Sequence, residues 1–137
     1  MEFGIVGLGR MGGNMARRLA RKGLRIAAHN RSHEVSEALA AETGHLACAT
    51  LGELVAALQA PRIVWLMLPA GEATEAALTT LLPLLGPGDL VVDGANAYYK
   101  DDQRRAELLA ARQIEFVDAG DQRELAHHRR LAGDGQA

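Results

Sequence analysis

Three glycines near the start of the chain are spaced for binding a phosphate group. They lie in Gly7-Leu8-Gly9-Arg10-Met11-Gly12, between a short apolar run and a helical pattern. In that context Gly7 permits a tight turn, Gly9 lets the backbone approach a pyrophosphate, and Gly12 lets the helix pack close to the strand. The free N–H groups and the positive end of the helix dipole would face the anion. The alternative is a glycine-rich turn that binds nothing.

A second polar segment follows the next predicted strand. NAD sites usually carry an acidic residue about 20 positions after the glycines, but this chain has Asn30-Arg31-Ser32 there. Asn30 and Ser32 can hydrogen-bond to a 2′-phosphate, and Arg31 can pair with its charge and stack on adenine. The segment therefore predicts NADP rather than NAD. The alternative leaves Arg31 as a solvated loop residue and gives His29 or Glu34 the larger role.

Alternating strands and helices must hold these segments. Apolar runs predict strands at 3–7, 25–29, 46–48, 62–68, 90–93 and 114–117. Helical spacing and caps predict helices from residue 11 to the glycine at 23, at 33–42, through 51–58, through 78–81, and at 101–112. The pattern is typical of an α/β fold, a Rossmann-type doubly wound parallel sheet in one domain. Ligands of such sheets bind beyond the carboxyl ends of the strands.

The composition narrows the class of protein. Apolar residues make up 48%, charged residues 23%, and the net charge is -2, which leaves no excess of positive charge for nucleic acid or an anionic membrane. No apolar stretch approaches the roughly 18 residues of a transmembrane helix, and the N-terminus does not resemble a signal peptide. The single cysteine, Cys48, favours a reducing compartment, so we expect the cytoplasm. We expect Cys48 to be a small core residue rather than a nucleophile.

Three segments resemble the β-hydroxyacid dehydrogenases, and the second and third resemble one branch of them, the decarboxylating 6-phosphogluconate dehydrogenases. They are the opening glycine segment at 4–15, the Trp-Leu-Met-Leu-Pro-Ala-Gly segment at 65–71, and the Asp-Gly-Ala-Asn-Ala-Tyr-Tyr-Lys-Asp-Asp segment at 93–102. The last is similar to the family's D-G-G-N-S-x-Y, whereas relatives acting on 3-hydroxyisobutyrate carry D-x-S-T. Ala95 and Ala97 replace the family's glycine and serine, which puts some substrate contacts in doubt.

The resemblance implies NADP as cofactor and 6-phosphogluconate as the substrate of the intact parent, oxidised and decarboxylated to ribulose 5-phosphate in the pentose phosphate pathway. The implied contacts are Gly7, Gly9, Arg10, Met11 and Gly12 to the pyrophosphate, Asn30, Arg31 and Ser32 to the 2′-phosphate, Leu68, Pro69 and Ala70 to the ribose and nicotinamide, and Asn96 to the nicotinamide and the sugar acid. The simpler alternatives make Met11, Met15 and Met67 core residues and Asn96 a turn residue.

The resemblance stops after Gly120, where the family continues Thr-Ser-Gly-Gly and this chain reads Asp121-Gln122-Arg123. With G/C-rich codons these three residues would be encoded by GAC-CAG-CGG, and the same bases read one position later encode Thr-Ser-Gly. We therefore hypothesise a frameshift after Gly120. Sequencing of the locus tests this hypothesis. We expect an NADP-binding domain at 1–120 and a polar, disordered tail at 121–137. The adjacent His127 and His128 are a poor ligand set, and we expect no metal site.

The resemblance also implies where the catalytic residues of the family lie. In the family a lysine base and a glutamate acid come from a following helical domain, which also builds the homodimer, and neither has a matching position in these 137 residues. We therefore expect a truncated oxidoreductase domain that lacks the helical C-terminal domain and its catalytic residues and is inactive alone. The alternative is a non-enzymatic NADP-binding module or a gene remnant. Use of another hydroxyacid is a third possibility, against which the segment around Asn96 argues.

Overall fold

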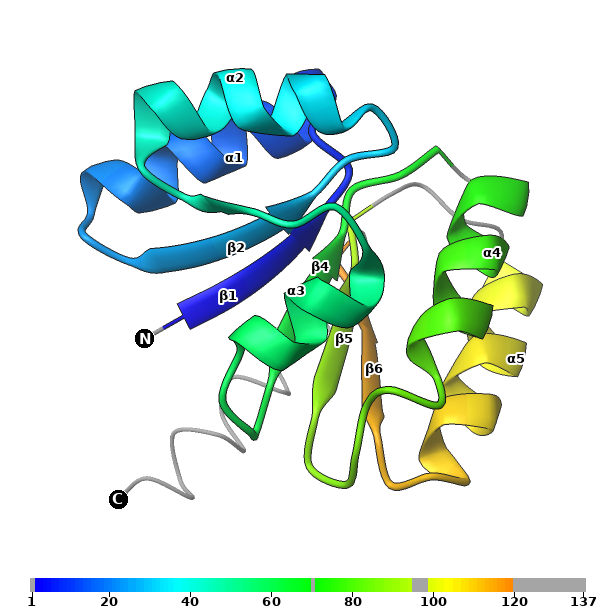
Figure 1. The fold of residues 1–137 in the computed structure, drawn as a ribbon. Helices are drawn as coiled ribbons and strands as arrows, with labels where there is room; N and C mark the ends of the chain where they lie inside the picture. The colour runs from blue at the N-terminus through cyan, green and yellow to red at the C-terminus, as the bar shows by residue number, and fades with distance from the viewer. Residues whose placement is uncertain (1, 70, 95–98, 120–137) are drawn as a thin grey trace.

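A six-stranded parallel sheet forms the centre of the protein (Figure 1). The computed structural model describes residues 2–69, 71–94 and 99–119. The strands are β1 (Glu2–Val6), β2 (Arg25–His29), β3 (Leu46–Ala47), β4 (Ile63–Leu66), β5 (Leu90–Asp93) and β6 (Glu115–Asp118). Their order is β3-β2-β1-β4-β5-β6, and every neighbouring pair is parallel. This order confirms the predicted doubly wound, Rossmann-type sheet.

Helices cover both faces of the sheet. They are α1 (Arg10–Arg21), α2 (His33–Thr43), α3 (Leu51–Ala57), α4 (Glu72–Leu81) and α5 (Tyr99–Ala110). Figure 1 shows α1 and α2 together beside β1 and β2, with α4 and α5 together on the other side near β4 to β6. Because successive strand residues face opposite ways, Ile5 packs with the first helix pair while Val6 packs with α3 and α4.

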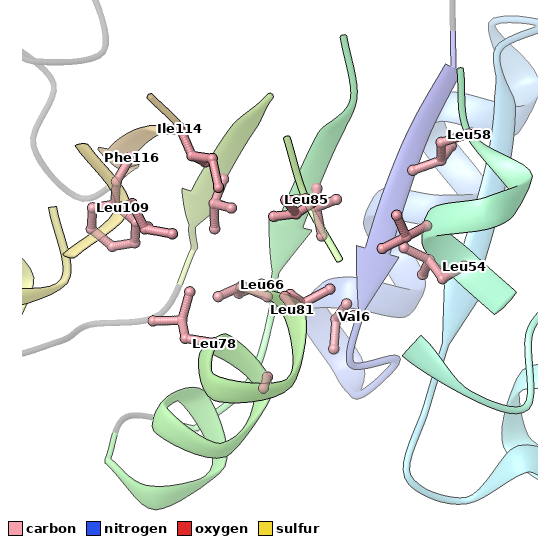
Figure 2. Packing of buried hydrophobic residues seen from close by; sticks show 14 of the residues in the cluster. Val6, Leu54, Leu58, Leu66, Leu78, Leu81, Leu85, Leu109, Ile114 and Phe116 are labelled. Atoms are coloured by element: carbon pink, nitrogen blue, oxygen red, sulfur yellow. The ribbon is translucent and has the colours of Figure 1, made fainter. Parts of the chain in front are cut away.

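The larger core lies beneath α3, α4 and α5. Figure 2 shows Leu54 of α3 and Leu81 of α4 close to Val6 and Leu66 of the strands, and all four are at most 2% exposed. Cys48 belongs to the same cluster, and burial raises the pKa of its thiol, so the thiol stays protonated at neutral pH. The prediction that Cys48 is a core residue is confirmed.

The short helix α3 begins after Thr50, whose spacing to Glu53 predicts a capping box. The Thr50 hydroxyl accepts a hydrogen bond from the backbone N–H of Glu53 at 3.1 Å. The Glu53 carboxylate in turn accepts one from the N–H of Ala49 at 2.8 Å, one residue earlier than in the usual capping box. The two bonds fix where the chain turns from β3 into α3.

The fourth strand differs from its prediction. The apolar composition of 62–68 predicts a strand that is buried on both faces, but the ladder covers only Ile63–Leu66. Val64 and Leu66 are fully buried in the larger core, whereas Ile63 and Trp65 are half-buried. Ile63 and Trp65 point to the opposite face of the sheet from Val64 and Leu66. The helices on that face, α1 and α2, pack mainly against β1 and β2, so they cover Ile63 and Trp65 only in part.

The buried histidine after α2 makes stability depend on pH. His45 is 7% exposed, and its ring contacts the Thr43 hydroxyl at 2.6 Å and the Ser36 hydroxyl at 3.4 Å. Burial lowers the pKa of this imidazole, and the bond to Ser36 only partly opposes the shift. Below about pH 6.5 the unfolded chain therefore binds more protons at this site than the folded chain, and stability falls as the pH falls.

We therefore expect a His45→Gln variant to lose less stability than the parent between about pH 7 and pH 5. Thermal unfolding of both proteins across this range measures the difference, because the other titrating groups are common to them. Parallel curves would show that protonation of His45 does not contribute.

Candidate dinucleotide site at the carboxyl edge of the sheet

The loops that follow the central strands are joined at the carboxyl edge of the sheet. The N–H of Gly7, just after β1, donates to the carbonyl of His29 at the end of β2, at 2.8 Å. The N–H of Gly94, just after β5, donates to the carbonyl of Leu66 at the end of β4, at 2.9 Å. This edge is where open parallel sheets bind their ligands.

Two glycines of the loop after β1 are required by the packing of the protein itself. Gly7 has φ +97°, and a Cβ there would lie 2.5 Å from the carbonyl oxygen of Met67. A Cβ on Gly12 would overlap the carbonyl oxygen of Gly7. These positions give the tight turn and the close helix–strand approach that the spacing predicts.

Gly9 is different, because the fold does not need a glycine there. Its φ is -68°, which any residue adopts, and a Cβ would meet no atom within 4 Å. Helix α1 begins directly after it with no side-chain cap and no acidic residue in its first turn, whereas α2, α3 and α4 each carry glutamate there. Gly9 therefore leaves the N–H groups at a helix N-terminus open, as an anion requires.

The side chains beside Gly9 face the solvent. Arg10 is exposed and Met11 is 68% exposed. The interpretation of Met11 as a core residue is therefore wrong. Met11 lies one turn before Met15 and Ala16, where α1 begins to pack on the sheet.

In the segment after β2, the side chain of Asn30 bonds to the protein, whereas Arg31 and Ser32 are exposed to solvent. The Asn30 side-chain oxygen accepts from the N–H of Leu8 at 2.9 Å, and its nitrogen donates to the Ser32 carbonyl at 3.1 Å. Arg31 is exposed and takes part in none of the ion pairs among the described residues. Ser32 is the exposed N-cap residue of α2, but its side chain makes no capping bond. The Arg31 and Ser32 side chains are thus free to contact a ligand.

The loop between β4 and α4 lies next to the glycine loop. Leu68 is half-buried, Pro69 is exposed, and the hydroxyl of the buried Thr74 donates to the Pro69 carbonyl at 3.0 Å. The role of Thr74 is not predicted from the sequence, where a threonine in the first turn after the loop is its only signal. Gly94 belongs to the segment that resembles the family, but the resemblance does not predict its packing role, which is that a Cβ there would overlap the sulfur of Met67.

Other predicted positions lie outside the described residues. They are Ala70, the segment 95–98 with Asn96, and the tail 121–137 with His127 and His128. Within the described part of the chain, no group of three or more His, Cys, Asp or Glu side chains could hold a metal ion. Nor does that part contain a helix long and apolar enough to span a membrane.

A buried ion-pair network supports the carboxyl end of β5. Asp93, its last residue, is fully buried, and Arg105 of α5 is 2% exposed. The Arg105 guanidinium lies 3.6 Å from the Asp93 carboxylate and 2.9 Å from the Glu75 carboxylate of α4. Arg104, 58% exposed, contacts the same Glu75 oxygen at 2.7 Å. Helices α4 and α5 are thereby tied to the strand that leads into the segment with Asn96.

Comparison with known proteins agrees with this geometry. The family model of the NAD binding domain of 6-phosphogluconate dehydrogenase matches residues 2–121. The NADP(+)-dependent, decarboxylating 6-phosphogluconate dehydrogenase of Bacillus subtilis (strain 168) is 37% identical over 122 residues, which are 87% of this chain and 26% of that enzyme. The decarboxylating enzyme of Bacillus licheniformis is 36% identical over 121 residues, again 26% of its length.

The solved structures include 6-phosphogluconate dehydrogenase of Plasmodium falciparum, described in its apo form and in complex with its cofactor NADP+ and its substrate 6-phosphogluconate. It aligns with a TM-score of 0.78 and 29% identity over 85% of this chain and 26% of that one. The chain thus spans about a quarter of the length of the curated relatives it matches. Since the family model covers most of its residues, the chain belongs to the family of the NAD-binding domain of 6-phosphogluconate dehydrogenase.

Proposed function

We propose that residues 1–120 form the NADP-binding domain of a 6-phosphogluconate dehydrogenase-like oxidoreductase. Gly9 carries this proposal. Its conformation and surroundings would accept a side chain, yet glycine keeps the N-terminus of α1 open. A pyrophosphate at this point would meet backbone N–H groups and the positive end of the helix dipole. Arg10 and Met11, both exposed, would flank it.

The neighbouring loops would hold the two ends of the cofactor. Arg31 and Ser32 would bind the 2′-phosphate, through the guanidinium charge and the hydroxyl of the α2 N-cap. The preference for NADP is also supported by the B. subtilis relative, whose name states that it is NADP(+)-dependent. At the other end, the nicotinamide and its ribose would lie against Leu68, Pro69, Ala70 and Asn96.

The chain would supply the cofactor half of the reaction. When bound, NADP would supply the hydride acceptor for the oxidation of 6-phosphogluconate, the step that precedes loss of CO2 to ribulose 5-phosphate. The described loops bind and orient the cofactor. The resemblance assigns the lysine base and the glutamate acid to a helical domain that follows the matched segment, so we propose that residues 1–137 alone bind NADP without turning over substrate.

Replacing Gly9 by alanine tests the proposal directly. We expect Gly9→Ala to weaken NADP binding at least tenfold, because the methyl group would stand where the pyrophosphate approaches the backbone. The melting temperature should fall by only a few degrees, because the methyl group meets no packed atom within 4 Å and the remaining cost is that alanine is a poorer helix N-cap than glycine. Calorimetric titration of the purified chain with NADP and NAD measures both affinities.

The matched control is Gly86→Ala. A Cβ on Gly86 also meets nothing within 4 Å, but Gly86 lies in the turn before β5, so NADP affinity should be unchanged. If the parent chain bound neither cofactor, or if Gly9→Ala bound NADP as tightly as the parent, the proposed function would be wrong.

A further inference from the structure

The Asn30 side chain joins two loops of the cofactor site. Its amide oxygen accepts from the N–H of Leu8, which lies inside the glycine loop, at 2.9 Å. Its amide nitrogen donates to the carbonyl of Ser32, at 3.1 Å. A backbone N–H can only donate and a carbonyl can only accept, so the two partners together fix the orientation of the amide.

We propose that Asn30 is a positioning residue that sets the glycine loop against the loop of Arg31 and Ser32, and that it does not act chiefly by binding the 2′-phosphate. This inference rests on the proposed cofactor site. The Leu8 side chain is 5% exposed and packs in the smaller core with Ile5 and Leu39. Leu8 is therefore held from two sides, by apolar packing of its side chain and by the hydrogen bond from its N–H to Asn30.

The chemistry of the two partners explains why this position suits asparagine. An apolar side chain would leave the Leu8 N–H without its acceptor. An aspartate could still accept from Leu8, but it could not donate to the Ser32 carbonyl, and its charge would repel a 2′-phosphate. Only an uncharged group with both an acceptor and a donor serves the two loops together.

The two roles give different patterns of cofactor affinity. A residue that contacts only the 2′-phosphate affects NADP, because NAD lacks that group. A residue that positions the pyrophosphate loop affects both cofactors, because both carry the pyrophosphate. The ratio of NADP to NAD affinity therefore separates a positioning role from a direct contact.

The experiment compares Asn30→Ala and Arg31→Ala by calorimetric titration with NADP and with NAD. We expect Asn30→Ala to weaken both cofactors by a similar factor, about tenfold. We expect Arg31→Ala to weaken NADP by about tenfold or more and to leave NAD unchanged. Asn14→Ala, which removes an exposed amide of α1 that contacts Arg17, is the matched control and should leave both affinities unchanged.

Asn30→Asp keeps the acceptor for Leu8 and covers the case in which the alanine variant does not fold. It should hold NAD within about threefold of the parent while losing NADP affinity. Loss of NADP affinity alone in Asn30→Ala, with NAD unchanged, would overturn the positioning role. The positioning role would also be overturned if Asn30→Asp bound NAD no better than a folded Asn30→Ala variant. Failure of the parent to bind either cofactor would instead refute the proposed function, so the two failures are distinguishable.

Discussion

Replacing Arg105 by methionine is expected to lower the free energy of unfolding by about 3–5 kcal/mol. Methionine can occupy much of the same space, but it removes the cation that faces the fully buried carboxylate of Asp93 and the carboxylate of Glu75. A buried carboxylate that loses a nearby cation loses the attraction that offset much of the cost of its desolvation. Urea denaturation followed by circular dichroism measures the loss.

The neighbouring arginine provides the control. Arg104 contacts the same oxygen of Glu75 but is 58% exposed. Arg104→Met should therefore cost less than about 1 kcal/mol, since solvent screens an exposed pair. Similar losses in the two variants would show that burial of Arg105 does not determine its contribution.

A Gly12→Ala substitution is expected to cost on the order of 3 kcal/mol or to prevent folding. The new Cβ would overlap the carbonyl oxygen of Gly7 and lie 3.1 Å from its carbonyl carbon and 3.2 Å from Cβ of Met67. None of these atoms is the end of a flexible side chain, so relief requires movement of the backbone of α1 or of the glycine loop.

The adjacent glycine should respond in the opposite direction. A Cβ on Gly13 has its nearest neighbours at 3.7–3.9 Å, which is ordinary contact, and alanine is favoured over glycine within a helix. Gly13→Ala should therefore stabilise the protein by about 0.5–1 kcal/mol. Thermal and urea unfolding of both variants test the contrast, and destabilisation by both would mean that α1 tolerates no added volume here.

Most of the fold can be predicted from the sequence because its signals are local. The helix after β3 follows from Thr50 and Glu53, three residues apart, and both make capping bonds. The burial of Trp65 and Met11 could not be predicted, because it depends on which distant helices cover each residue. An apolar run shows that a strand is buried, but not whether both of its faces are.

The candidate site is likewise predictable from the sequence only where its signals are local. The glycine loop follows from spacing alone, and Gly7 and Gly12 adopt the close approaches that the spacing predicts. Nothing in the sequence showed that Asn30 bonds to the N–H of Leu8, because the two lie far apart in the chain and a backbone N–H has no residue signature. From the sequence alone, Arg105 cannot be distinguished from an exposed arginine, because its partners Glu75 and Asp93 lie in other elements of the chain.

The central position of β1 has a consequence for how the protein is made. β1 pairs with β2 on one side and with β4 on the other, and β2, β3 and three helices lie between β1 and β4 in the chain. A nascent chain that has not yet reached Ile63 therefore leaves one edge of β1 unpaired, and such an edge invites self-association. The loop at Gly7 also lacks its neighbour Met67 at that stage. A cofactor can therefore stabilise the glycine loop only after β4 has paired with β1.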